Sequence, residues 1–289
     1  MYLYAGKLSV IQYADDSQLL ICGKKSELPA MIRHVEASLA ELVDWFCQND
    51  MKINMSKTQL LVLGTKAMLC DVPQITIHVG TALVTETKSV KNLGLVIDKH
   101  LTFEHHVDQL TAKCTGMLMA LMHAKHVVPK CTLRQIVESL VISSIRYCIS
   151  IYGTCGTTQM HRVQKLVNFC IRVITGKRKY ESVSREAERL RILSARNLAD
   201  YHELTLVKST LRFGEPEALR EIFEYVAHGR ETRQSGQLRL PRVRSEIGKR
   251  RISFRGAKLF NELPANMQTT LHMSRFKDDL VQMLRTNRA

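Results

Sequence analysis

The spacing of apolar residues changes near residue 101, and this change limits the possible folds more than any other feature of the sequence. Up to that point most apolar residues lie in short runs typical of strands, apart from one helical stretch over 28–46. Beyond it they recur at helical spacing over 107–121, 133–152 and 160–174. Three amphipathic helices with short connections predict a helical bundle. The expected fold class is therefore α+β, with the strands in the first third of the chain.

The first 100 residues contain several strand signals around the one helix. A strand, turn and strand are predicted over 8–21, with two acidic residues in the turn. A short strand is expected over 60–63, a hairpin over 74–85 and a further strand over 93–98. Taken in order, these elements predict one α+β sheet layer.

Downstream of Gly176 the pattern stays helical but becomes strongly basic. A helix is predicted over 198–211, ending at Gly214, and another is expected near the C-terminus, capped by Ser274. Residues 230–258 hold ten Lys and Arg against two Asp and Glu without a clear period. That composition predicts an exposed basic loop.

We divide the chain into three parts, residues 1–100, 101–176 and 177–289, and the charge is distributed unevenly among them. Residues 1–100 contain ten Lys and Arg and ten Asp and Glu, so the formal net charge of +15 lies in the remainder. A surplus of this size predicts a polyanionic partner, with nucleic acid the first candidate. The sequence has no run of about 18 apolar residues, so no transmembrane helix is expected.

The eight cysteines and the first residues bear on the cellular compartment. No Cys-x-x-Cys pair occurs, and several cysteines fall on apolar helix faces, which favours buried free thiols in a reducing compartment. The first residues lack the charged region, apolar region and cleavage site of a signal peptide. The chain is therefore expected inside the cell, in the cytoplasm, the nucleus or both.

Two adjacent carboxylates, Asp15 and Asp16, occupy the turn of the first predicted hairpin. Side by side they repel each other unless a cation lies between them. Hard oxygen ligands of this kind suit Mg²⁺ or Mn²⁺. Asp is also common in solvated turns, so the turn by itself leaves both a metal site and a plain hairpin turn open.

The acidic turn belongs to a pattern of three segments. These are Tyr13-Ala14-Asp15-Asp16, then Met51-Lys52-Ile53-Asn54-Met55-Ser56-Lys57-Thr58, then the stretch from Val90 to Val107. In this order and spacing they resemble the reverse transcriptase of non-LTR retrotransposons of the jockey-like or CR1-like kind. Two positions depart from the family pattern: Asn92 stands where the family usually has an aromatic residue, and Phe103 stands where it often has a tryptophan. The segment 251–264 is similar to the tail that often ends these element-encoded proteins.

The resemblance implies RNA-directed DNA synthesis by two divalent metal ions, Mg²⁺ or Mn²⁺. Asp15 would be a metal ligand, and Asp16 a weaker ligand or a supporting charge. Tyr13 would pack beside the primer or the nucleotide. Lys57 would lie near the leaving pyrophosphate, in an electrostatic or general-acid role.

The resemblance also implies contacts with an RNA template and a DNA primer. Leu93 and Gly94 would sit in the hairpin that grips the primer end. The helices over 107–176 would form a thumb, whose basic residues follow the backbone of the heteroduplex. The nucleic-acid surface is expected to include three consecutive basic residues, Lys177, Arg178 and Lys179.

On this interpretation residues 1–100 are a partial polymerase palm, 101–176 a helical thumb bundle and 177–289 a basic, mostly helical C-terminal region. A two-metal site needs more oxygen ligands than one turn supplies, and the family's other indispensable Asp precedes this turn on a separate strand. Because the twelve residues before Tyr13 do not provide it, we expect that this chain alone does not polymerise DNA. Two alternatives stay open, a non-catalytic nucleic-acid-binding protein derived from such an element and an unstable decay product of one.

Overall fold

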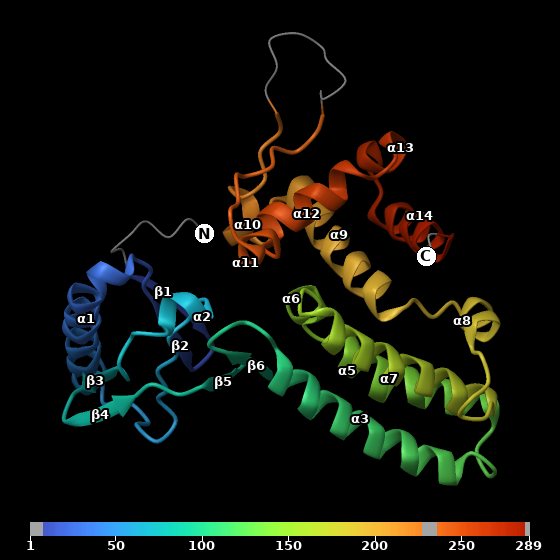
Figure 1. The fold of residues 1–289 in the computed structure, drawn as a ribbon, viewed down its shortest axis with the longest axis horizontal. Coiled ribbons are helices and arrows are strands. Elements are labelled where there is room, and N and C mark those ends of the chain that lie inside the picture. Colours follow the sequence, from blue (N-terminus) through green and yellow to red (C-terminus); the bar gives the residue numbers. More distant parts are fainter. Residues whose placement is uncertain (1–7, 227–235, 287–289) are drawn as a thin grey trace. The chain divides into compact units, whose positions relative to one another are not determined.

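The structure is a computed structural model that describes residues 8–226 and 236–286 (Figure 1). It divides into two compact units, Met1–Leu101 and Thr102–Ala289, which we call unit 1 and unit 2. Unit 1 combines helices with three small β-hairpins, and unit 2 is built from helices. The α+β class predicted from the sequence is confirmed, with more helix than strand.

The strands of unit 1 form three separate antiparallel hairpins. β1 (Ser9–Tyr13) pairs with β2 (Asp16–Leu20), β3 (Thr76–Val79) with β4 (Ala82–Thr85), and β5 (Ser89–Asn92) with β6 (Leu95–Asp98). The prediction of a single sheet layer is therefore wrong, since each of these described strands has one partner. Each strand has four or five residues, and a two-residue turn connects the two strands of each hairpin. Each strand therefore pairs with its neighbour in the sequence.

The last hairpin places Leu93 in a turn, where the sequence predicted a strand. Leu93 (φ 45°) and Gly94 (φ 87°) both have a left-handed backbone, as a type I′ turn between two antiparallel strands requires. The strand predicted over 60–63 is also wrong, because only Leu60 makes a bridge, to Glu86. Leu60 and Val62 of that segment instead pack on the core of unit 1.

The core of unit 1 lies between its long helix and the second hairpin. A 3₁₀ turn (Lys25–Glu27) leads into α1 (Leu28–Gln48), which has a proline in its first turn and ends at Asn49, as the sequence predicted. Leu39 of α1 is buried in one cluster with Ile77 and Val79 of β3. A short helix, α2 (Lys66–Leu69), follows in the loop before β3.

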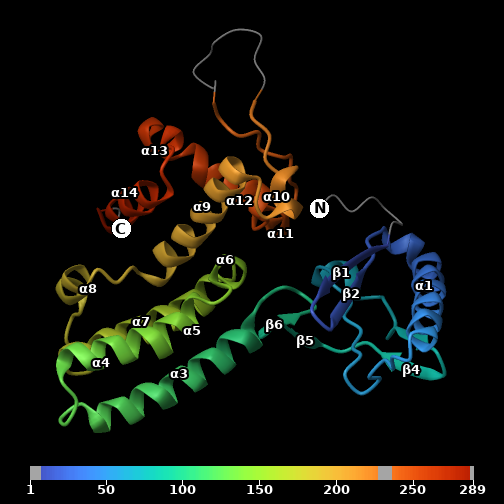
Figure 2. The same ribbon diagram turned by 180° about the vertical axis from the view of Figure 1, so that it is seen from behind.

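Two long helices lie side by side in the first half of unit 2, α3 (Glu104–Ala124) and α7 (Thr157–Thr175) (Figure 2). Between them in the chain come α4 (Lys130–Ile136), a π-helical segment (Val137–Ile142), α5 (Ser143–Arg146) and α6 (Ile149–Tyr152). One helical stripe was predicted over 133–152, but the helix is interrupted at Cys148, whose backbone is left-handed (φ 56°). The buried Tyr152 hydroxyl donates to the Ile145 carbonyl across this break.

The second half of unit 2 is arranged around one long helix. The helices are α8 (Ser184–Leu190), α9 (Ala195–Phe213), α10 (Glu217–Arg220), α11 (Glu246–Lys249), α12 (Ile252–Asn261), α13 (Ala265–Thr269) and α14 (Met273–Thr286). The long helix α9 ends at Gly214, as predicted, and packs against α12 and α14. Part of the basic loop predicted over 230–258 is helical instead, because α12 buries Ala257 and Phe260 between its basic residues. Residues 230–235 of that prediction lie outside the described residues.

Cysteine burial and helix hydropathy complete the description of the fold. All eight cysteines are free, as expected, but only Cys114, Cys155 and Cys170 are buried. Burial raises the pKa of the Cys170 thiol to about 12. Among the described residues, no helix combines the length and the apolar character that a bilayer span requires.

Candidate catalytic turn and nucleic-acid interface

The acidic turn forms the tip of the β1–β2 hairpin, as the sequence predicted. Tyr13 and Asp16 face each other at the last register position, which leaves Ala14 and Asp15 at the tip. Ala14 has a left-handed backbone (φ 51°), a conformation that costs a non-glycine residue about 1–2 kcal/mol. Both carboxylates are exposed at this tip, and the Tyr13 side chain beside them is 64% exposed.

The two carboxylates do not by themselves form a two-metal site. No group of three His, Cys, Asp or Glu side chains in the described part of the chain is placed to hold a metal ion. Two Mg²⁺ or Mn²⁺ ions at a phosphoryl-transfer site need more oxygen ligands than Asp15 and Asp16 supply. The described residues thus do not fit a complete site for these ions, and no catalytic step through a metal follows from them.

An amide pair joins the acidic hairpin to the hairpin of Leu93 and Gly94. The Gln18 Nε2 donates to the Asn92 Oδ1 (2.8 Å), and the Asn92 Nδ2 donates to the Gln18 Oε1 (3.1 Å). Gln18 lies two residues beyond Asp16 and on the same face of β2, because side chains alternate along a strand. Asn92 immediately precedes the Leu93 turn. The pair therefore holds two of the predicted functional turns in one part of unit 1.

Lys57 lies in a separate turn of unit 1, between α1 and α2. Asn54 organises this turn, since its carbonyl oxygen accepts hydrogen bonds from the backbone N–H groups of Lys57 (3.1 Å) and Thr58 (3.1 Å). The Lys57 side chain is exposed. Within the described ranges no hydrogen bond or ion pair joins it to the acidic turn, so the fold presents the two features separately.

The three consecutive basic residues lie in the loop between α7 and α8, which we call the basic loop (residues 177–183). Lys177 is partly buried: its Nζ donates to the Ser182 carbonyl oxygen (2.9 Å) and forms an ion pair with the Glu186 carboxylate (3.0 Å). Through this contact Lys177 holds the pKa of Glu186 below its usual value. Arg178 and Lys179 are exposed. Only two of the three predicted contact residues therefore have side chains free to meet a ligand at the surface.

Two residues that the sequence reasoning did not single out shape this loop. The Arg172 guanidinium of α7 donates to the carbonyl oxygens of Arg178 and Glu181 (3.2 Å each). Tyr180 is 91% exposed, and the Lys179 Nζ lies 5.6 Å from the centroid of its ring. The sequence signal for it was an aromatic residue placed directly after a run of basic residues.

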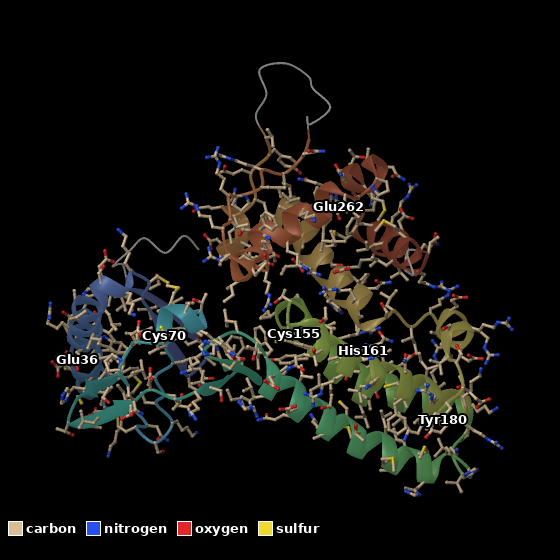
Figure 3. The ribbon with its side chains drawn as sticks, viewed as in Figure 1. Glu36, Cys70, Cys155, His161, Tyr180 and Glu262 are labelled. Carbon is tan, nitrogen blue, oxygen red and sulfur yellow. The ribbon has the colours of Figure 1, made fainter. Side chains whose placement is uncertain are left out.

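A groove with a volume of about 840 Å³ runs between α7, α8 and the start of α9. Its polar lining includes His161, Gln164 and Asn168 of α7, and Ser182 of the basic loop contributes to its wall. Figure 3 shows His161 on α7 and Tyr180 beyond the C-terminal end of that helix. The basic loop thus borders a concave face of unit 2 that polar and apolar side chains line together.

Known proteins that resemble this chain are RNA-directed DNA polymerases encoded by mobile elements. The chain is 25% identical over 178 residues to the RNA-directed DNA polymerase from mobile element jockey of Drosophila funebris, a match of 60% of this chain and 19% of that protein. It is 26% identical over 174 residues to the probable RNA-directed DNA polymerase from transposon BS of Drosophila melanogaster, a match of 58% of this chain and 18% of that protein.

These matches show a distant, partial similarity to the reverse transcriptases of non-LTR retrotransposons, as the resemblance in the motifs indicated. The chain spans about a fifth of the length of the curated relatives it matches. No protein-family profile matches the sequence, and no solved structure matches it significantly.

Proposed function

We propose that this chain is the primer- and product-binding part of a non-LTR retrotransposon reverse transcriptase, acting in RNA-templated DNA synthesis. The observation that carries the proposal is the acidic turn. Its two carboxylates stand exposed at a hairpin tip, and the Gln18–Asn92 amide pair ties that hairpin to the Leu93–Gly94 turn. The similarity to the jockey and BS polymerases supports the same assignment.

Each residue of the acidic turn then has a role that fits its position. Asp15 and Asp16 contribute oxygen ligands for Mg²⁺ or Mn²⁺, which would stabilise the attacking and leaving oxygens of nucleotidyl transfer. Tyr13, exposed beside them, packs against the primer or the incoming nucleotide. Outside the acidic turn, Lys57 lies in a separate turn, and in this proposal it supplies positive charge near the leaving pyrophosphate. Since two carboxylates do not complete a two-metal site, further oxygen ligands come from outside the described residues.

The nucleic-acid-binding part of the proposal rests on unit 2. Residues 102–289 contain 32 Lys and Arg against 17 Asp and Glu, and residues 1–101 are neutral overall. A phosphate backbone is the natural partner of such a surplus, because each neutralised phosphate releases condensed counterions. In this proposal α3 to α7 act as the thumb, and Leu93 and Gly94 contact the primer end.

A second candidate function is binding of nucleic acid without catalysis. The observation that favours it is that the basic unit 2 is a compact unit of its own, whereas the acidic turn lacks a third ligand among the described residues. Both candidates predict salt-dependent binding to an RNA–DNA heteroduplex. They differ in whether Asp15 and Asp16 are needed for a reaction.

A chimera separates the two candidates. It carries, in front of this chain, the segment of the jockey polymerase that precedes the matching region, and it is assayed by primer extension on an RNA template with Mg²⁺ or Mn²⁺. We expect the isolated chain to bind a heteroduplex without extending the primer, and the chimera to extend it. Asp15→Asn and Asp16→Asn should abolish extension by the chimera while leaving heteroduplex binding intact.

Two outcomes would contradict the proposal. A chimera that folds and binds the heteroduplex but does not extend the primer favours the non-catalytic candidate. Template-dependent extension by the isolated chain would show that the described residues suffice for catalysis, and the expected requirement for further ligands would then be wrong.

A further inference from the structure

The basic loop is held rigidly from within. The Gly176 backbone N–H bonds to the Arg172 carbonyl oxygen (2.8 Å), and the Arg172 guanidinium bonds to two carbonyl oxygens of the loop (3.2 Å each). The Glu181 carboxylate accepts a hydrogen bond from the Arg178 backbone N–H, and Lys177 holds the far side of the loop at Ser182. These contacts use backbone groups of the loop and the side chains of Lys177 and Glu181.

What the loop presents outward is an aromatic ring among cations. Tyr180 is 91% exposed, so nearly the whole ring is open to a ligand, and Lys179 lies beside it. Arg178 is exposed next to them, and Arg185 and Arg189 continue along one face of α8 at i, i+4 spacing. The two nearest carboxylates are already engaged, Glu181 by the Arg178 N–H and Glu186 by Lys177.

An exposed ring on a pre-ordered loop is suited to one kind of contact. A base has a π-face that stacks on tyrosine whatever its sequence, and stacking of this kind is a main source of affinity for single strands. The bases of a duplex already stack on each other, so their faces are not open to a side chain. The flanking cations complement the phosphates on either side of a stacked base.

We propose that Tyr180 is a stacking platform for an unpaired base of single-stranded nucleic acid, with Arg178 and Lys179 on the neighbouring phosphates. The strand continues along the groove between α7, α8 and α9, which Ser182 of the basic loop helps to line. This inference rests on the proposed nucleic-acid-binding function. It adds that the ligand is single-stranded and that Tyr180 is the residue that stacks on its base.

The test measures the affinity of the full chain for fluorescein-labelled 15-nucleotide strands by anisotropy over a series of salt concentrations. Single-stranded RNA, single-stranded DNA and a duplex of the same length form the three arms. The variants are Tyr180→Ala, Tyr180→Phe and the pair Arg178→Ala with Lys179→Ala. Phe213→Ala is the matched control, because Phe213 is 55% exposed with the Arg212 guanidinium 5.2 Å from its ring centroid, at the end of α9.

We expect Tyr180→Ala to weaken single-strand binding at least about fivefold, and to leave both the duplex affinity and the salt slope unchanged. Tyr180→Phe keeps the ring and should bind like wild type, as should Phe213→Ala. Neutralising Arg178 and Lys179 should instead lower the salt slope by roughly one for each phosphate that the variant no longer neutralises. A thermal melt of each variant checks that it is folded.

The results that overturn the inference differ from those that overturn the proposed function. If wild type binds duplex but not single strands, or if Tyr180→Ala matches wild type, nucleic-acid binding stands and the stacking platform does not. An equal loss in Tyr180→Phe would assign the effect to the hydroxyl and contradict stacking. If an acidic polyglutamate or an anionic vesicle competes as well as single-stranded RNA, the loop is a general polyanion surface. Absence of any nucleic-acid binding by wild type would overturn both.

Discussion

At the scale of single residues, three adjacent cations lie in two different environments. Lys177 is partly buried: its ammonium bonds to the Ser182 carbonyl oxygen within the basic loop and pairs with Glu186 of α8. Arg178 and Lys179 face solvent. Charge and position in the sequence are nearly the same for all three. The neighbouring carboxylate and the course of the loop decide which cation is available to a ligand.

We predict that Lys177→Ala and Arg178→Ala have opposite effects. Lys177→Ala should lower the thermal midpoint slightly and raise the pKa of Glu186 toward its ordinary value. Arg178→Ala should leave the midpoint unchanged and lower the salt slope of nucleic-acid binding by about one. Because the folded pKa of Glu186 is depressed, its contribution is present above the unfolded value of about 4.3 and is lost as pH falls through the folded pKa.

Thermal melts of both variants between pH 7 and pH 3, with anisotropy titrations at pH 7, measure these effects. The gap in midpoint between wild type and Lys177→Ala should close at the acid end of the series. A gap that persists undiminished at pH 3, or an equal loss of midpoint in Arg178→Ala, would contradict the assignment of Lys177 to the loop structure.

At the scale of elements, unit 1 depends on side chains to connect hairpins that share no backbone ladder. β1–β2 and β5–β6 each pair only internally, so the reciprocal bonds of Gln18 and Asn92 are a direct tie between them. A two-stranded hairpin is marginally stable in water by itself. The orientation of the acidic turn therefore depends on this tie and on the packing of Leu19 against the core of unit 1.

We predict that Asn92→Ala releases the acidic hairpin. The change removes two hydrogen bonds and leaves the Gln18 amide without its partner, at a cost of about 1–3 kcal/mol. Amide hydrogen exchange within β1 and β2 should accelerate, while exchange within β3 and β4 should not change. Gln12→Ala is the matched control on the same hairpin, since its side chain is exposed. Unchanged exchange in β1 and β2 of Asn92→Ala would show that core packing alone holds the turn.

At the scale of the whole molecule, the C-terminal helices are fastened to α9 by a buried ion cluster. Arg255 of α12 forms ion pairs with Asp200 and Glu203 of α9, and Glu203 is 1% exposed. Burial raises the pKa of Asp200, an effect that the charge of Arg255 opposes. Nearby, the buried Lys208 ammonium lies 5.5 Å from the Phe276 ring centroid of α14. Segments about 50 to 70 residues apart in the chain thus meet around α9.

We predict that Arg255→Met destabilises the protein by about 3–5 kcal/mol, because it leaves the buried Glu203 charge without a partner. Adding Glu203→Gln to Arg255→Met should recover part of this loss. Arg251→Met, an exposed position at the start of the same helix, is the control and should change the free energy of unfolding by less than about 0.5 kcal/mol. Urea denaturation measures all three, and equal stabilities of Arg255→Met and Arg251→Met would contradict the role of the cluster.

Much of the fold could be predicted from local pattern, and the misses share one cause. The start of α1 follows from a proline, and the ends of α7 and α9 follow from two C-cap glycines, signals that act within one or two turns of the chain. The interruption of the helix at Cys148 was missed because the apolar periodicity continues through it. The tertiary structure shows the interruption, which the Tyr152 hydroxyl spans by its hydrogen bond to the Ile145 carbonyl oxygen. The helix α12 was missed because exposed cations mask its short apolar face.

The sequence by itself determined the acidic hairpin turn, the period of the long helices and the location of the charge surplus, because each depends on residues close together in the chain. Only the tertiary structure decided that the acidic turn is tied to Asn92, that Lys177 is engaged while Tyr180 is presented, and that Arg255 closes a buried cluster on α9. Those contacts join residues from 9 to 74 positions apart along the chain. Which distant side chains meet depends on packing, and no local pattern encodes it.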